Sequence, residues 1–228
     1  MHVSRLLLLA LVLALTACGG GDDEPVATNE PEATDATTTA ASSTSGPCEN
    51  VARPEPKPDG GQEPPTEALD EAKTYDLVVE TNCGSFTIQL DQTTAPKTAA
   101  SLVTLAESGF FDGTTFHRVV PGFVIQGGDP TGTGTGGPGY TTVDVPPADT
   151  AYTKGAVAMA KAGNDEPGTS GSQFFVVTAP DARLPAEYAI VGEVTDGMDT
   201  VTAIEALGVG DGPPAQPVVI EKVTVESS

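Results

Sequence analysis

The stretch of sequence that decides the fold covers residues 116–129 and reads Phe116-His117-Arg118-Val119-Val120-Pro121-Gly122-Phe123-Val124-Ile125-Gln126-Gly127-Gly128-Asp129. It contains two short apolar runs on either side of a Pro-Gly pair, and each run is typical of a β-strand. Because side chains alternate between the two faces of a strand, the runs set an arginine and a glutamine among apolar side chains. The stretch therefore predicts two short strands that form a wall of a binding surface.

A second stretch lies further along the chain, after Met159-Ala160-Lys161 and a loop, and reads Gly171-Ser172-Gln173-Phe174-Phe175-Val176-Val177. In this order and spacing, both stretches resemble the cyclophilin family of peptidyl-prolyl cis–trans isomerases, and the resemblance covers roughly Tyr75 to Glu226. It implies a mainly β fold, an eight-stranded antiparallel closed β-barrel capped by two α-helices. It also implies a substrate groove outside the barrel, across the strands that carry the two stretches.

The hydrophobic pattern, taken without the resemblance, also indicates mostly antiparallel β structure. Alternating apolar residues over 75–80 and 86–90 predict a hairpin that turns at Asn82-Cys83-Gly84. Helical spacing predicts helices over 95–108 and 198–206, and we expect Thr94 to cap the first of them. Further strand-like runs lie at 115–120, 123–126, 155–160, 173–178, 189–194 and 218–225.

The amino terminus has the pattern of an export signal. Arg5 precedes the apolar run 6–15, and Leu15-Thr16-Ala17-Cys18 follows, which predicts a lipoprotein signal peptide over residues 1–17 with Cys18 lipidated. Ten apolar residues are fewer than the ~20 that span a bilayer. We therefore expect an extracytoplasmic protein, lipid-anchored to the bacterial cell membrane. A secretory signal that is cleaved elsewhere is the alternative.

Residues 18–70 are rich in acidic residues, Pro, Thr and Ala, with almost no large apolar side chain. Such a composition buries too little surface to offset the loss of chain entropy, so it predicts a disordered tether. A small second domain is the alternative. Residues 71–228 are predicted to form the single folded domain.

The net charge of the chain is −22, with 32 acidic and 10 basic residues. Residues 71–228 alone hold 20 acids against 7 bases. This surface repels phosphate backbones, so nucleic-acid binding is disfavoured. An acidic surface that attracts basic polypeptides and a merely solvated surface both remain open.

The glycine-rich stretch 131–139 lacks the Gly-Lys-Ser/Thr ending of a phosphate-binding loop and is expected to be a flexible loop.

Lipidation of Cys18 would leave Cys48 and Cys83 as an even pair in a compartment where disulfides form. We expect a disulfide between them, and two free thiols are the alternative. Neither cysteine lies at a spacing from histidine that is typical of a nucleophile or a metal site. No metal and no cofactor are expected.

Isomerisation of an X–Pro bond must overcome the resonance of the amide, a barrier of ~18–20 kcal/mol. A catalyst needs a dry pocket for the proline ring and a hydrogen-bond donor that favours the twisted, pyramidal nitrogen. An arginine suits this task because it stays charged and presents several N–H groups in one plane. Arg118 is the predicted donor, and Gln126 is predicted to hold its guanidinium or the substrate carbonyl.

The resemblance implies that Arg118 and Gln126 are catalytic and that the substrate is bound by Phe123, Val124, Ala160, Lys161, Gln173, Phe175, Leu184 and Tyr188. Four positions depart from the common family pattern, and the first is Val124, which stands where methionine is common. Lys161 stands where asparagine is usual, Arg183 where many members carry an aromatic residue, and Tyr188 where eukaryotic members often have histidine. These departures put cyclosporin sensitivity in doubt more than activity.

The sequence therefore predicts a peptidyl-prolyl cis–trans isomerase that assists the folding of exported proteins. Its partners would be proline-containing unfolded or flexible polypeptides, and a monomer is expected. The alternative is a membrane-tethered chaperone or adaptor that binds proline-containing peptides through the same groove with weak turnover.

Overall fold

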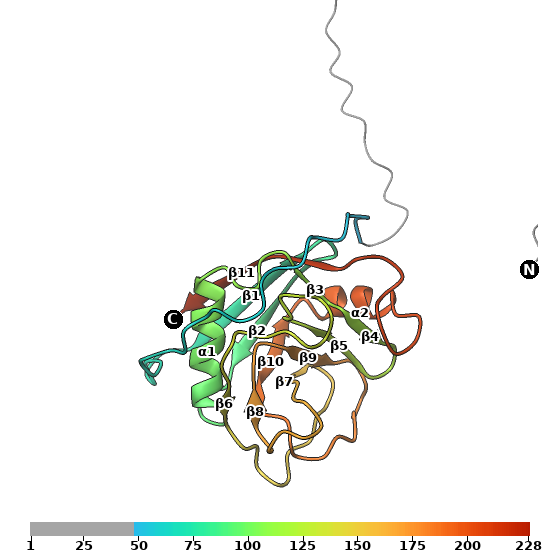
Figure 1. Ribbon diagram of the computed structural model, residues 1–228. Coiled ribbons are helices and arrows are strands. Elements are labelled where there is room, and N and C mark those ends of the chain that lie inside the picture. The colour runs from blue at the N-terminus through green and yellow to red at the C-terminus, as the bar shows by residue number, and fades with distance from the viewer. Residues whose placement is uncertain (1–47) are drawn as a thin grey trace, which may run out of the picture. The chain divides into compact units, whose positions relative to one another are not determined.

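The computed structural model describes residues 48–228 (Figure 1). The predicted signal peptide, Cys18 and the tether up to residue 47 lie outside these residues. Within them, no helix is both long enough and apolar enough to cross a bilayer.

Nine strands form one curled antiparallel sheet, which Figure 1 shows wrapped around the core. Their bounds are β1 Tyr75–Thr81, β2 Gly84–Leu90, β3 Thr114–Thr115, β4 Arg118–Val120, β5 Val124–Gly127, β7 Ala156–Met159, β9 Phe174–Val177, β10 Ile190–Asp196 and β11 Val219–Ser227. The strand order is β3-β11-β1-β2-β10-β7-β9-β5-β4. A separate two-stranded sheet pairs β6 (Thr142–Val143) with β8 (Thr169–Ser170), and the sequence pattern missed both of these strands.

The predicted mainly β fold with two helices is confirmed, but a closed eight-stranded barrel is not. The edge strands of the curled sheet, β3 and β4, follow each other in the sequence and are separated only by Phe116 and His117. The curl of the sheet therefore brings its two edge strands close together in space. No strand ladder joins β3 to β4 in the described part of the chain, so the sheet is not a closed barrel.

The hairpin of β1 and β2 shows how alternation builds the core. Leu77 pairs with Ile88 and Val79 with Phe86, so every second residue of both strands points inward, and all four side chains are buried. The two-residue turn at Asn82 and Cys83 agrees with the predicted turn.

The helices are α1 (Pro96–Glu107) and α2 (Met198–Glu205), close to the predicted ranges. The predicted cap was wrong, because α1 begins after Ala95 and no local side chain caps it. Instead, the carboxylate of Asp144 accepts the backbone N–H of Thr98 at 2.7 Å. A residue distant in the sequence therefore does the work of an N-cap.

The chain differs from the predicted tether over residues 48–70, here called the N-terminal arm. The arm runs along the surface of the domain (Figure 1) and makes backbone hydrogen bonds to it, such as Lys57 N to Pro130 O at 2.8 Å. The ammonium of Lys57 donates to the carbonyls of Gly109, Phe110 and Asp112, just beyond the end of α1. Because a proline-rich chain has little conformational freedom to lose, a few such contacts suffice to dock it.

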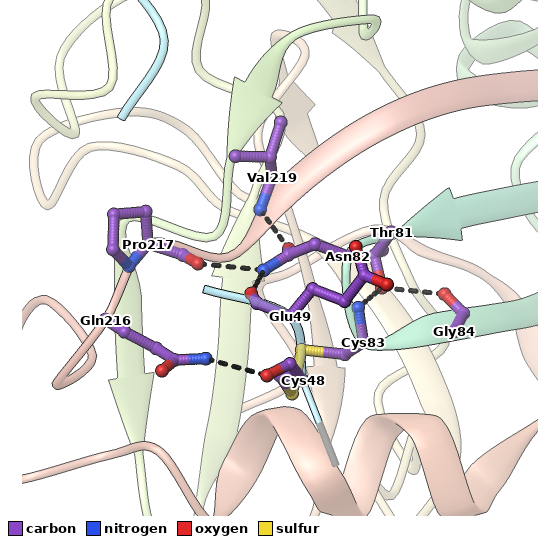
Figure 2. Close-up of a disulfide and its surroundings, with 9 residues drawn as sticks. All are labelled: Cys48, Glu49, Thr81, Asn82, Cys83, Gly84, Gln216, Pro217 and Val219. Atoms are coloured by element: carbon purple, nitrogen blue, oxygen red, sulfur yellow. Dashed lines mark hydrogen bonds between the residues drawn. A yellow bond between two sulfur atoms is a disulfide. The ribbon is translucent and has the colours of Figure 1, made fainter. Parts of the chain in front are cut away.

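A disulfide between Cys48 and Cys83 fastens the start of the arm to the β1–β2 turn (Figure 2). The adjacent Asn82 side chain donates to the carbonyls of Glu49 and Pro217. Its oxygen accepts the N–H of Val219, the first residue of β11. The turn therefore joins the arm, the hairpin and the start of the last strand at one point.

Candidate active site

The register of three neighbouring strands places the candidate catalytic residues in one row on the outer face of the sheet. Arg118 of β4 lies opposite Gln126 of β5, which lies opposite Phe175 of β9. Phe175 in turn pairs with Ala158 of β7. Directly opposite residues of antiparallel strands share a face, so a cation, an amide and an aromatic ring are adjacent.

The structure also decides which way the residues of β5 point. Ile125 is fully buried in the main core, whereas Val124 packs into a second apolar cluster on the other side of the sheet. Phe123 packs against that second cluster as well, although it directly precedes Val124. The reason is the turn at Gly122, whose φ of 71° changes the chain direction just before the strand begins.

A groove of about 230 Å³ lies over this second cluster. Nine of the ten predicted residues line it, and they are Arg118, Phe123, Val124, Gln126, Ala160, Lys161, Phe175, Leu184 and Tyr188. The tenth, Gln173, lines an adjoining hollow of about 340 Å³.

The guanidinium of Arg118 is held from two sides at the rim of the groove. Its Nη1 donates to Gln126 Oε1 at 3.2 Å, while Nε and Nη2 donate to the two carboxylate oxygens of Asp211. The guanidinium carbon lies 5.8 Å from the centre of the Phe123 ring. The side chain remains 30% exposed, so a substrate can reach it.

Gln126 continues the hydrogen-bond chain away from Arg118. Its Nε2 donates to Gln173 Oε1 at 3.0 Å, and Gln173 Nε2 donates to the carbonyl of Gly136 at 2.9 Å. The orientation of both amides is therefore set by the glycine-rich loop as well as by the strands.

The floor of the groove is apolar and built from aromatic rings. Phe175 and Val124 are 4% and 2% exposed. Phe175 and Tyr188 meet edge to face with ring centres 5.7 Å apart. Tyr152 packs beneath both rings and exchanges hydrogen bonds with the backbone of Tyr188. This packing fixes a water-poor surface that suits an apolar ring.

Lys161 does not extend its charge into the groove. Its side chain is only 4% exposed, and its ammonium contacts the carbonyls of Ala162 and Asp165 and the carboxylate of Glu187. It also lies 5.7 Å from the centre of the Tyr188 ring. The lysine at this position therefore ties two loops together beside the groove.

Sequence reasoning missed Asp211, which neutralises the charge of Arg118. The two residues are 93 positions apart, and Asp211 lies in an irregular segment between α2 and β11 with no local motif. The hydrogen bonds and positive charge of Arg118 lower the pKa of the Asp211 carboxyl. No pattern in the sequence signals this pair.

His117 and Arg183 lie outside the groove. His117 is buried, neither of its ring nitrogens has a hydrogen-bond partner among the described residues, and burial lowers its pKa. Arg183 is exposed on the loop before Leu184, with a φ of 52°. Within residues 48–228, no group of three or more His, Cys, Asp or Glu side chains is placed to hold a metal ion.

The fold and this site define a curled β-sheet protein with an apolar groove on its outer face, rimmed by a guanidinium and an amide. A family model described as "Cyclophilin type peptidyl-prolyl cis-trans isomerase/CLD" matches residues 76–225. The chain belongs to this family.

Several relatives are named as peptidyl-prolyl cis-trans isomerases. The chain is 41% identical over 172 residues to peptidyl-prolyl cis-trans isomerase A of Mycobacterium tuberculosis, covering 67% of this chain and 92% of the relative. It is 50% identical over 106 residues to peptidyl-prolyl cis-trans isomerase B of Bacillus subtilis, covering 46% and 72% of the two chains.

A solved structure has the same fold. The cyclophilin-type isomerase of Cryptosporidium parvum superposes with a TM-score of 0.62 at 32% identity, covering 68% of this chain and 99% of the other. These relatives, together with the family match, establish the activity of the chain as a peptidyl-prolyl cis–trans isomerase.

Proposed function

We propose that Arg118 is the hydrogen-bond donor that makes this site an isomerase. During rotation the prolyl nitrogen loses its resonance and becomes pyramidal, so its lone pair can accept a hydrogen bond that the planar amide cannot. A donor fixed beside that nitrogen favours the twisted state over both planar ground states. The hydrogen bonds from the guanidinium to Gln126 and Asp211 support this role, because a donor that is already oriented needs no reorganisation during the reaction.

The proline ring is proposed to lie against Phe123, Val124, Phe175 and Leu184. The residue before proline would pair with backbone groups near Ala160 and Lys161, and Tyr188 and Gln173 would bound the two ends of the groove. One neighbouring structure, the C. parvum isomerase, was solved "in the presence of dipeptide ala-pro". An Ala-Pro unit is therefore a suitable first probe for the groove of this chain. The step needs no covalent intermediate, because only rotation about one bond occurs.

The test compares wild type with Arg118→Ala and Arg118→Lys in magnetization-exchange spectroscopy on a short Ala-Pro peptide. We expect the alanine variant to lose about 10²-fold in kcat/KM, the scale of removing one fixed donor from a catalytic site. Lysine should recover only part of the loss, since its single ammonium cannot contact Gln126 and Asp211 in the same plane.

Arg183→Ala is the matched control, because Arg183 is an exposed arginine near the groove that does not line it. Full activity in Arg118→Ala would show that the donor role is wrong. Tight peptide binding by the wild type without faster exchange would instead support the peptide-binding chaperone or adaptor.

We also propose that the enzyme acts on exported, proline-containing polypeptides outside the cytoplasm, as a monomer anchored through a lipid on Cys18. The signal-like residues 1–17 and the Cys48–Cys83 disulfide support this location, because disulfides persist in oxidising compartments. Mass analysis of the mature amino terminus tests the anchor. An unmodified terminus away from Cys18 would exclude it.

A further inference from the structure

The N-terminal arm is an addition to the family domain. The family match begins at residue 76, whereas the arm occupies residues 48–70 and is already packed on the domain at its first described residue. The middle of the arm, residues 57–62, contacts Pro130 and the glycine-rich loop 131–139 that follows β5.

Four hydrogen bonds tie the arm to this region. Lys57 N donates to Pro130 O at 2.8 Å, Gly60 N to Gly137 O at 2.9 Å, and Gln62 N to Pro138 O at 2.9 Å. In the other direction, Gly137 N donates to the carboxylate Oδ1 of Asp59 at 2.8 Å. Gly137 is thus bound through both of its backbone polar groups, which leaves the tip of the loop little freedom to move.

The loop transmits this restraint to the candidate catalytic residues. Gly136, next to Gly137, accepts a hydrogen bond from Gln173, and Gln173 accepts one from Gln126. Gln126 in turn accepts a hydrogen bond from Nη1 of Arg118. Four hydrogen bonds of 2.8–3.2 Å, together with the peptide group that joins Gly136 to Gly137, therefore connect Asp59 to the guanidinium of Arg118.

The arm itself is anchored at two points. The Cys48–Cys83 disulfide fixes its start, and Lys57 fixes its middle by donating to three carbonyls near the end of α1 while lying 5.8 Å from the centre of the Phe110 ring. Figure 2 shows that Cys48 O also accepts a hydrogen bond from Gln216, which belongs to the same segment as Asp211. The disulfide end of the arm therefore contacts the segment that also carries Asp211, the carboxylate bound to Arg118.

We propose that the arm is a working part of the isomerase site, and that Asp59 is a positioning residue which acts through Gly137, Gln173 and Gln126 on Arg118. This inference rests on the proposed role of Arg118. A site that a second element holds in place keeps its donors oriented in the absence of substrate, and such preorganisation lowers the barrier of the chemical step rather than strengthening substrate binding.

The decisive comparison is between Asp59→Ala and Asp59→Asn in the full chain. Alanine removes the acceptor for Gly137 N, whereas asparagine keeps a side-chain carbonyl oxygen at that place. We expect Asp59→Ala to lower kcat about fivefold with KM almost unchanged, equivalent to about 1 kcal/mol, the scale of one hydrogen bond. Asp59→Asn should restore most of the activity.

Glu63→Ala is the matched control, because Glu63 is an exposed carboxylate of the same arm outside the hydrogen bonds to the loop. The side-chain amide resonances of Gln126 and Gln173 and the Nε–Hε signal of Arg118 should shift in Asp59→Ala and stay in place in Glu63→Ala. A merely structural role would lower the melting temperature without moving these signals. Equal kcat in the alanine variants of Asp59 and Glu63 would overturn the inference.

A second variant removes both anchors of the arm by combining Cys48→Ser, Cys83→Ser and Lys57→Met. If it still folds, its kcat should fall at least as far as that of Asp59→Ala. If this variant does not fold, the comparison of Asp59→Ala with Asp59→Asn alone tests the proposal. Loss of activity in Arg118→Ala with no effect in Asp59→Ala would refute the arm inference and leave the proposed donor role standing. No effect in Arg118→Ala would refute the donor role itself.

Discussion

Arg118 has its chemistry set by contacts that come from three parts of the chain. Gln126 lies opposite it on the neighbouring strand, Phe123 offers a ring face, and Asp211 approaches from the segment after α2. The carboxylate holds two of the nitrogens and leaves Nη1 directed towards Gln126. Asp211 therefore orients the guanidinium while it also reduces the net charge at the rim.

Replacing Asp211 with asparagine should lower kcat only about two- to fivefold, because solvent screens an exposed ion pair. The loss should disappear in the background of Arg118→Lys, because the paired geometry is already absent there. Peptide exchange measured across this double-mutant cycle tests the prediction. Glu221→Gln, at an exposed residue of β11, serves as the control. Additive effects of the two substitutions would contradict a shared role.

His117 supplies a pH dependence of stability that can be isolated, because it is the only histidine among residues 48–228. Burial lowers its pKa, partly opposed by the nearby Asp129 carboxylate, so the folded state favours the neutral ring more than the unfolded chain does. Below the ordinary histidine pKa of about 6.5, the unfolded chain binds a proton that the folded chain resists, and stability must then fall as the pH falls.

We expect the free energy of unfolding in urea to decrease from pH 7 to pH 5, with a slope no steeper than about 1.4 kcal/mol per pH unit. His117→Leu should remove most of this slope. A variant that keeps the full slope would show that carboxyl groups, rather than His117, cause it.

The first helix shows how an element can depend on a distant residue. Nothing near Ala95 caps α1, and its third residue, Thr98, donates both its backbone N–H and its hydroxyl to Asp144. The negative charge also lies at the positive end of the helix dipole. The start of α1 is therefore stabilised by Asp144, which directly follows β6 and lies 46 residues beyond Thr98 in the chain.

Asp144→Ala should lower the free energy of unfolding by about 1–2 kcal/mol, the usual cost of losing an N-cap. Asp149→Ala provides the comparison, because Asp149 is an exposed carboxylate of the same loop. Urea titrations followed by circular dichroism would measure both. An equal effect of the two substitutions would show that Asp144 has no capping role.

At the scale of the whole molecule, a disulfide joins the arm to the turn between β1 and β2. Cys48 and Cys83 are 35 residues apart, and both sulfur-bearing side chains are buried. Cross-linking restricts the unfolded chain more than the folded one, and the loop-entropy model gives about 3–4 kcal/mol for a loop of this length. The link also lies where Asn82 connects the arm to the start of β11.

Cys48→Ser combined with Cys83→Ser should therefore lower the free energy of unfolding by about 3–4 kcal/mol. Wild type treated with a reductant should show the same loss, because both changes open the same loop. Urea titration with and without reductant measures it. No difference between reduced and oxidised wild type would contradict a stabilising disulfide.

The sequence by itself determined the parts of the protein that depend on local pattern. Period-two alternation predicted the hairpin of β1 and β2, and helical spacing predicted α1 and α2, because each pattern reflects the geometry of one element. The resemblance to the cyclophilin family, rather than the alternation of one strand, predicted the residues that line the groove, and nine of the ten do so.

Only the tertiary structure decided the features that join distant parts of the chain. Three such features are hydrogen bonds between residues more than 40 positions apart. They join Arg118 to Asp211, Thr98 to Asp144, and the arm to the glycine-rich loop. The two-residue strands β6 and β8 are also too short for alternation to show. The arm illustrates the reason most clearly. Its composition lacks the apolar residues for a core of its own, so it is ordered by hydrogen bonds, one lysine and one disulfide that the rest of the fold supplies.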